Sequence, residues 1–125
     1  MTAAESDHPV SVLLPGRRAL LVRLSCPEGR RTALLDALNT YVDGLAEEPG
    51  TEVFVIAVDP DDESTVWLYE IFANEQAELD HRSSTGFAEL MAALPALLDD
   101  PPAVLRSVPL RLSLQKAVLR ETWVL

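Results

Sequence analysis

His81 is the residue of this sequence best suited to transfer a proton near neutral pH, because a histidine side chain titrates at about pH 6.5. Glu70 lies on the same face of a predicted strand as Val66, Leu68 and Phe72. A carboxylate among apolar neighbours is either paired or has a raised pKa. These two residues therefore suggest an acid–base site. The alternatives are a histidine that orders the end of a helix and a buried structural glutamate.

Trp67 and Tyr69 alternate with Glu70 along the same strand and point to its other face. If that face meets the helices, the two side chains could bind an aromatic substrate, with the Tyr69 hydroxyl holding a substrate oxygen. If it meets a second subunit, they form the core of an interface. Alternation alone leaves both alternatives open.

Arg23 lies in the middle of an apolar strand, where a guanidinium needs a partner. It is a candidate to bind an anionic or phenolate oxygen, and a structural ion pair is the alternative. Phe87, Met91 and Leu94 recur at helical spacing and predict packing of a helix on the sheet. Phe87 and Met91 are also candidates to line a substrate cavity.

The composition excludes several classes of function. Ten basic and 20 acidic residues give a net charge of −10, which argues against nucleic acid and against anionic membranes as partners. No apolar run approaches the roughly 20 residues that span a bilayer, so the default expectation is a cytoplasmic protein. Cys26 is the single cysteine, and a Cys/His metal site lacks ligands. We therefore predict no metal or other cofactor, and a small apolar or aromatic molecule as ligand.

The order of the predicted elements indicates an α+β fold. Apolar alternation and helical periodicity predict strand, helix, strand, strand, helix pair and strand, at 18–26, 28–45, 51–59, 65–72, 75–94 and 110–115. This is the ferredoxin-like βαββαβ arrangement with a four-stranded antiparallel sheet. Residues 1–16 are predicted to be a flexible leader, 17–119 the domain and 120–125 a C-terminal tail.

Two predicted strands, 53–58 and 66–72, are apolar on both faces. The helices of this fold cover only one face of the sheet, and an exposed apolar face of this size is a liability for a monomer. A second copy is the simplest cover. We therefore predict a homodimer with the sheets packed face to face. The apolar C-terminal tail could cross onto the partner subunit.

Residues 66–87, VWLYEIFANEQAELDHRSSTGF, resemble the pattern of the antibiotic biosynthesis monooxygenase family, a strand ending in Tyr-Glu followed by His-x-x-Ser-x-His-Phe. The resemblance extends over roughly Ala19 to Val118 and implies a dimeric α/β barrel. Its matching residues are Glu48-Pro49-Gly50, Leu68-Tyr69-Glu70, Ala77, His81, Ser84 and Phe87.

The resemblance implies a cofactor-independent monooxygenase acting on an aromatic, quinol or polyketide-like molecule, with His81 as the catalytic residue. The alternatives are an isomerase or cyclase of a similar substrate and a non-catalytic ligand-binding domain. Gly86 stands where the family often has a second histidine, which weakens the case for proton transfer there. Met91, Phe72 and Val22 replace residues of the haem-degrading branch, so haem degradation is not expected.

Overall fold

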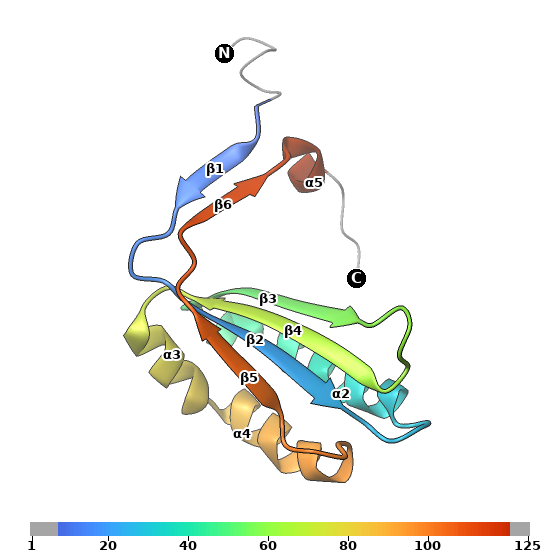
Figure 1. The fold of residues 1–125 in the computed structure, drawn as a ribbon. Helices are drawn as coiled ribbons and strands as arrows, with labels where there is room; N and C mark the ends of the chain where they lie inside the picture. The colour runs from blue at the N-terminus through green and yellow to red at the C-terminus, as the bar shows by residue number, and fades with distance from the viewer. Residues whose placement is uncertain (1–7, 121–125) are drawn as a thin grey trace. The chain divides into compact units, whose positions relative to one another are not determined.

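The computed structural model describes residues 8–120, so the ends of the predicted leader and tail, 1–7 and 121–125, lie outside the described residues. The chain divides into two compact units. Gly16–Val108 form the larger unit, and the smaller unit contains the described residues that precede and follow this range in the sequence (Figure 1). The candidate site lies entirely in the larger unit.

A four-stranded antiparallel sheet forms the framework of the larger unit. Its strands lie in the order β3-β4-β2-β5, in which the first and third strands of the unit, β2 and β4, are central. The strands are β2 Arg18–Ser25, β3 Thr51–Val58, β4 Thr65–Phe72 and β5 Ala103–Ser107. With one helix between β2 and β3 and two between β4 and β5, this is the predicted ferredoxin-like fold.

The helices lie in the predicted segments 28–45 and 75–94, and the first is shorter than predicted. They are α2 Arg31–Asp43, α3 Glu75–Arg82 and α4 Thr85–Ala93, with 3-10 turns η1 Leu45–Glu47 and η2 Leu94–Ala96. The Asn74 side chain caps α3 by accepting a hydrogen bond from the Ala77 amide (2.8 Å), and Ser84 caps α4 through the Phe87 amide (3.1 Å). Pro95 falls in η2, where the regular α-helix has already ended.

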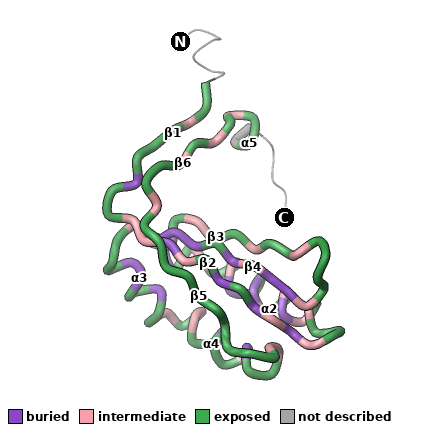
Figure 2. The backbone as a smooth tube through the Cα atoms, in the orientation of Figure 1, coloured by how far each residue is buried: buried purple, intermediate pink, exposed green. Residues whose placement is uncertain are grey.

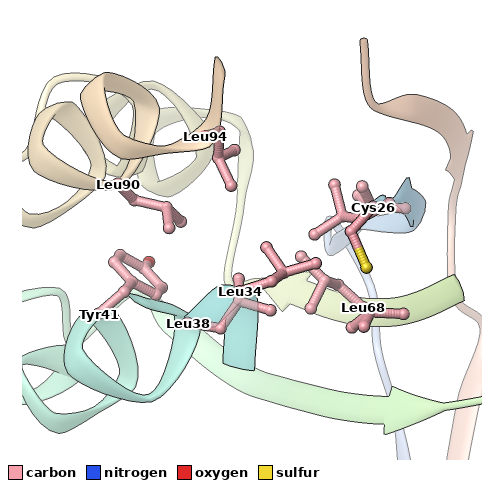
Figure 3. Close-up of a cluster of buried hydrophobic side chains, with 10 residues drawn as sticks. Cys26, Leu34, Leu38, Tyr41, Leu68, Leu90 and Leu94 are labelled. Carbon is pink, nitrogen blue, oxygen red and sulfur yellow. The ribbon is translucent and has the colours of Figure 1, made fainter. Parts of the chain in front are cut away.

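The core lies between one face of the sheet and the helices. Alternate residues of β2 and β4 are buried there against α2 and α4, as Figure 3 shows for Leu68, Leu34 and Leu90. The opposite face carries apolar side chains that are exposed in the single chain, including Leu21, Val55, Tyr69 and Leu105. Figure 2 shows the buried stretches concentrated in the central strands and the exposed backbone of β5.

The fourth strand of the sheet differs from the prediction. The segment expected to complete the sheet, 110–115, contains β6 Arg111–Leu114, which pairs with β1 Val10–Leu13 in the smaller unit. Helix α5, Lys116–Arg120, follows it. The edge position belongs to β5, whose residues are all exposed and show no apolar alternation. The prediction that 110–115 completes the sheet was therefore wrong, because apolar and polar residues alternate more clearly there than in β5. The predicted leader likewise contains a strand, β1.

Among the described residues, no helix is long and apolar enough to cross a membrane.

Candidate functional site

Close packing of helix α3 on strand β3 places His81 in the interior. His81 lies in the last turn of α3 and is 4% exposed. The helix approaches the start of β3 so closely that a Cβ atom at Gly50 would lie only 2.6 Å from the Cβ of Ala77. Because glycine has no Cβ, α3 can sit against this backbone and bring the imidazole beside Glu48.

Glu48 is the centre of a buried hydrogen-bond network on one side of the imidazole. His81 Nδ1 lies 2.7 Å from Glu48 Oε1, which also accepts hydrogen bonds from the hydroxyls of Tyr41 (2.9 Å) and Thr51 (3.1 Å). The Ser84 hydroxyl lies 3.0 Å from Glu48 Oε2. Burial first, and then the hydrogen bond to Glu48, raises the pKa of Tyr41, so the phenol keeps its proton and donates it.

This network fixes the tautomer of His81. The oxygen atoms of the Glu48 carboxylate can only accept, so the hydrogen-bond pattern assigns a proton to Nδ1 of His81. The Tyr41 oxygen, 2.8 Å from Nδ1, lies beside the same N–H. In the neutral imidazole Nε2 then carries the lone pair. Nε2 is then the ring nitrogen that is available to accept a hydrogen bond or a proton.

Glu70 faces the other nitrogen of His81. Its Oε1 atom lies 3.5 Å from Nε2, and the residue is 4% exposed. Burial, followed by the negative charges of Glu48 and Glu78, raises the pKa of Glu70 to about 7. A carboxyl with that pKa exchanges protons near neutrality, so Glu70 can gain or lose a proton in that range.

His81 and Glu70 both line a cavity of about 280 Å³ between the sheet and helices α3 and α4. The Phe87 ring packs on the imidazole with centroids 4.5 Å apart. An engineered apolar cavity of about 150 Å³ is known to bind benzene, so this one has room for one or two aromatic rings. Its lining residues are mainly apolar: Leu20, Val22, Leu24, Leu38, Phe54, Leu68, Phe87, Leu90, Met91, Leu94, Pro102 and Val104, with Glu70, His81, Arg82 and Arg106.

Comparison with known families agrees with this fold. The model of the family described as antibiotic biosynthesis monooxygenase matches residues 18–93, which is more than half of the chain. The chain belongs to this family. No curated protein matches the sequence.

Several solved structures share the fold of the larger unit. The Rv0793 protein of Mycobacterium tuberculosis is 24% identical with a TM-score of 0.69, over 74% of this chain and 94% of its own. The NE2512 protein of Nitrosomonas europaea, of unknown function, is 30% identical with a TM-score of 0.65, over 73% and 86%. A Caulobacter crescentus protein provisionally named an antibiotic biosynthesis monooxygenase is 17% identical with a TM-score of 0.70, over 76% and 91%.

The structure divides the candidate residues between the two faces of the sheet. His81, Glu70, Phe87 and Met91 line the cavity together. Trp67, Tyr69 and Arg23 lie on the helix-free face, where Arg23 pairs in register with Trp67. They take no part in the cavity, because successive side chains of a strand point to opposite faces and Glu70 occupies the inner one. For Trp67 and Tyr69, the interface alternative stays a prediction.

Sequence reasoning misses several polar residues of the site. The family resemblance includes Glu48 without giving it a role in the site, and Tyr41 is not among the candidate residues. Arg82 and Arg106 also line the cavity. The available signal for Tyr41 is a hydroxyl on the buried stripe of a helix, which needs a polar partner. Nothing local in the sequence identifies that partner as Glu48.

Gly86, which stands where many family members have a histidine, lies against the ring of Tyr41: a Cβ there would be 3.5 Å from Tyr41 Cδ1. Both residues border a second, more polar groove of about 650 Å³ between α2 and α4. With glycine at position 86, the polar groups in contact with Nδ1 of His81 are Tyr41 and Glu48. Within the described residues, no group of three or more His, Cys, Asp or Glu side chains is arranged to hold a metal ion.

Proposed function

We propose that this protein is a cofactor-independent monooxygenase that oxidises a phenol or quinol of one or two rings. The observation that carries the proposal is the position of His81 Nε2. Its imidazole is anchored through Nδ1 by Glu48 at 2.7 Å, Nε2 lies 3.5 Å from Glu70 Oε1, and both residues line an apolar cavity. A base in a dry cavity is what the direct reaction of a deprotonated phenol with O2 requires.

The first step is proton transfer from the substrate hydroxyl to Nε2 of His81. The imidazolium that forms is stabilised by Glu48 at Nδ1 and by an ionised Glu70 near Nε2. The phenolate is electron-rich, and the carbon para to its oxygen donates one electron to O2. The resulting radical pair combines into a C–O bond, and the peroxide takes the proton back from His81 to give a hydroperoxide.

The second step breaks the O–O bond. Nε2 removes the remaining proton from the oxygenated carbon, a C=O bond forms, and the outer oxygen leaves with that proton as water. One atom of O2 enters the product and the other enters water. All four electrons come from the substrate, so the reaction needs no external reductant.

The same base would also serve the alternative, an isomerase or cyclase, since Nε2 and Glu70 could move a proton between two carbon atoms of a substrate without O2. A non-catalytic binding domain is the remaining alternative. The room for two rings and the absence of Trp67 and Tyr69 from the cavity lining support an enzyme over a filled, inert core.

Oxygen-isotope labelling tests the proposal directly. The purified protein is incubated with 1-naphthol and related one- and two-ring phenols under 18O2, and product and O2 consumption are measured. We expect a quinone carrying one 18O atom and no hydrogen peroxide. Conversion of a substrate at equal rates under nitrogen would instead identify an isomerase or cyclase. No conversion of any phenol would reject the monooxygenase.

Substitutions test whether the reaction takes place at His81. His81→Ala is expected to lower kcat/KM by about 10²–10⁴-fold, the usual contribution of a general base. Glu48→Gln should lower kcat as well, because the amide can donate to Nδ1 and leave the proton on Nε2. His8→Ala removes the other histidine, which is exposed, and serves as the control. Equal activity of His81→Ala and His8→Ala would remove His81 from the mechanism.

We also propose that the protein works as a homodimer. Support comes from the helix-free face of the sheet, where Leu21 is 36% exposed, Tyr69 37%, Val55 45% and Leu105 65% in the single chain. These residues are contiguous across all four strands because Val55 pairs with Tyr69, Tyr69 with Leu21, and Leu21 with Leu105. A face-to-face partner sheet would bury this row.

A further inference from the structure

Two arginines lie at the solvent-facing side of the cavity and share one buried carboxylate. Arg82 Nη2 donates to Glu78 Oε2 at 2.9 Å, and Arg106 Nη2 lies 3.2 Å from Glu78 Oε1. The Glu78 side chain is 4% exposed, whereas those of Arg82 and Arg106 are 48% and 59% exposed. The carboxylate is therefore the fixed part, and the guanidiniums extend from it to the rim of the cavity.

The positive charge of the two arginines exceeds the negative charge of Glu78. One guanidinium neutralises one carboxylate, so the three side chains carry a surplus of one positive charge. Each guanidinium has five N–H donors, and for each the described structure records a bond from Nη2 to Glu78 as its hydrogen bond. Donors thus remain on both arginines. In a chain with a net charge of −10, this is a local positive site directly beside an apolar cavity.

The pairing of the strands sets the distance between this positive site and the reacting end of the cavity. Arg106 of β5 is the register partner of Leu20 in β2, and Leu20 is the partner of Glu70 in β4. All three point to the helix-covered face in one row across the sheet and line the cavity. Because adjacent strands lie about 4.8 Å apart, the backbones of Arg106 and Glu70 are roughly 10 Å apart.

We propose that the cavity selects a small aromatic acid, whose carboxylate binds the free donors of Arg82 and Arg106 while its opposite, hydroxyl-bearing end reaches His81 and Glu70. The arginines hold the charge at the rim, where it stays partly hydrated, and the rings occupy the apolar interior. Planar guanidiniums suit a carboxylate because they can bind both of its oxygen atoms. The role of the hydroxyl end rests on the proposed monooxygenase; the charge selectivity does not.

Binding can be measured without any reaction. We suggest isothermal titration calorimetry under nitrogen with 6-hydroxy-2-naphthoate, in which hydroxyl and carboxylate lie at opposite ends, and with its methyl ester. The full-length wild-type protein is expected to bind the acid at least about tenfold more tightly than the ester, the gain of one good charged contact. The preference should shrink at high ionic strength, because the arginines are partly exposed.

Matched variants assign the preference to the arginines. Arg82→Gln and Arg106→Gln should each weaken binding of the acid by about fivefold and change binding of the ester by less than about twofold. Each variant leaves Glu78 with one arginine, and Arg106→Lys should restore part of the affinity for the acid. Arg30→Gln makes the same change of charge at an exposed position away from the cavity and should leave both affinities unchanged.

The outcomes separate this inference from the proposed function. Tighter binding of the acid by wild-type protein, lost in the arginine variants but not in Arg30→Gln, supports it even if no oxidation occurs. Equal affinities for acid and ester, or binding of neither, overturn it, and oxidation of neutral phenols would then leave the monooxygenase standing. An equal loss in Arg30→Gln would reduce the effect to overall charge and would also overturn it.

Discussion

At the scale of single residues, protonation of Glu70 should make the free energy of unfolding depend on pH. Its pKa rises from an ordinary 4.5 to about 7 in the folded protein, mainly through burial. The folded state therefore binds more protons than the unfolded state between these values, so the free energy of unfolding should fall as the pH rises through this window. A shift of this size corresponds to roughly 3 kcal/mol once the pH exceeds the folded pKa.

Glu70→Gln should remove this dependence. Urea unfolding between about pH 5 and pH 8 is expected to show a steeper loss of stability in wild-type protein than in the variant, with the variant more stable at the upper end. Glu63→Gln, at an exposed glutamate, is the matched control and should follow the wild type. Parallel curves for wild type and Glu70→Gln would show that Glu70 is not protonated by folding.

At the scale of elements, the site depends on how closely helix α3 lies on the start of strand β3. Gly50→Ala would place a methyl group 2.6 Å from Ala77 Cβ and push the helix outward. We expect a loss of about 1–3 kcal/mol in the free energy of unfolding, the usual cost of overpacking, because the backbones cannot both keep their positions. His81 would also move away from Glu48, so kcat should fall with stability.

Gly44→Ala is the control for that substitution. Gly44 has φ −95° and a Cβ there would lie 3.6 Å from the Tyr41 carbonyl oxygen, an ordinary contact. Its alanine variant should be as stable as the wild type or slightly more so, since alanine loses less backbone entropy on folding. If urea unfolding gave the same small change for both variants, the close approach of α3 would not limit the site.

At the scale of the whole molecule, the helix-free face should decide the oligomeric state. Leu21→Glu would place a carboxylate from each subunit in the proposed interface, where its desolvation is unfavourable. Light scattering coupled to size-exclusion chromatography should give a dimer for wild-type protein and a monomer for the variant at micromolar concentration. Leu79→Glu, on helix α3 with Leu79 48% exposed, makes the same change elsewhere and should stay dimeric. A monomeric wild type would contradict the dimer.

The sequence by itself determined the helical segments of the larger unit and three of its four strands, β2, β3 and β4. Strand periodicity shows which side chains share a face, so it correctly separates Glu70 from Trp67 and Tyr69. Asn74 and Ser84 are residue types that favour the N-caps of helices, and both act as caps in the structure. These features depend on neighbours in the chain. The edge strand β5 was missed because it is short, exposed and without alternation, so its place depends on pairing with β2.

Only the tertiary structure decided which groups surround His81. It showed that the Glu70 face of β4 meets the helices, and it joined His81 to Glu48, which lies 33 residues earlier in the chain. It also brought Arg106 to Glu78 across 28 residues. Such contacts depend on the packing of α3 against the sheet, to which residues far apart in the sequence contribute. The sequence thus supplied a histidine and a glutamate as candidates, and the fold supplied the orientation, the raised pKa and the cavity.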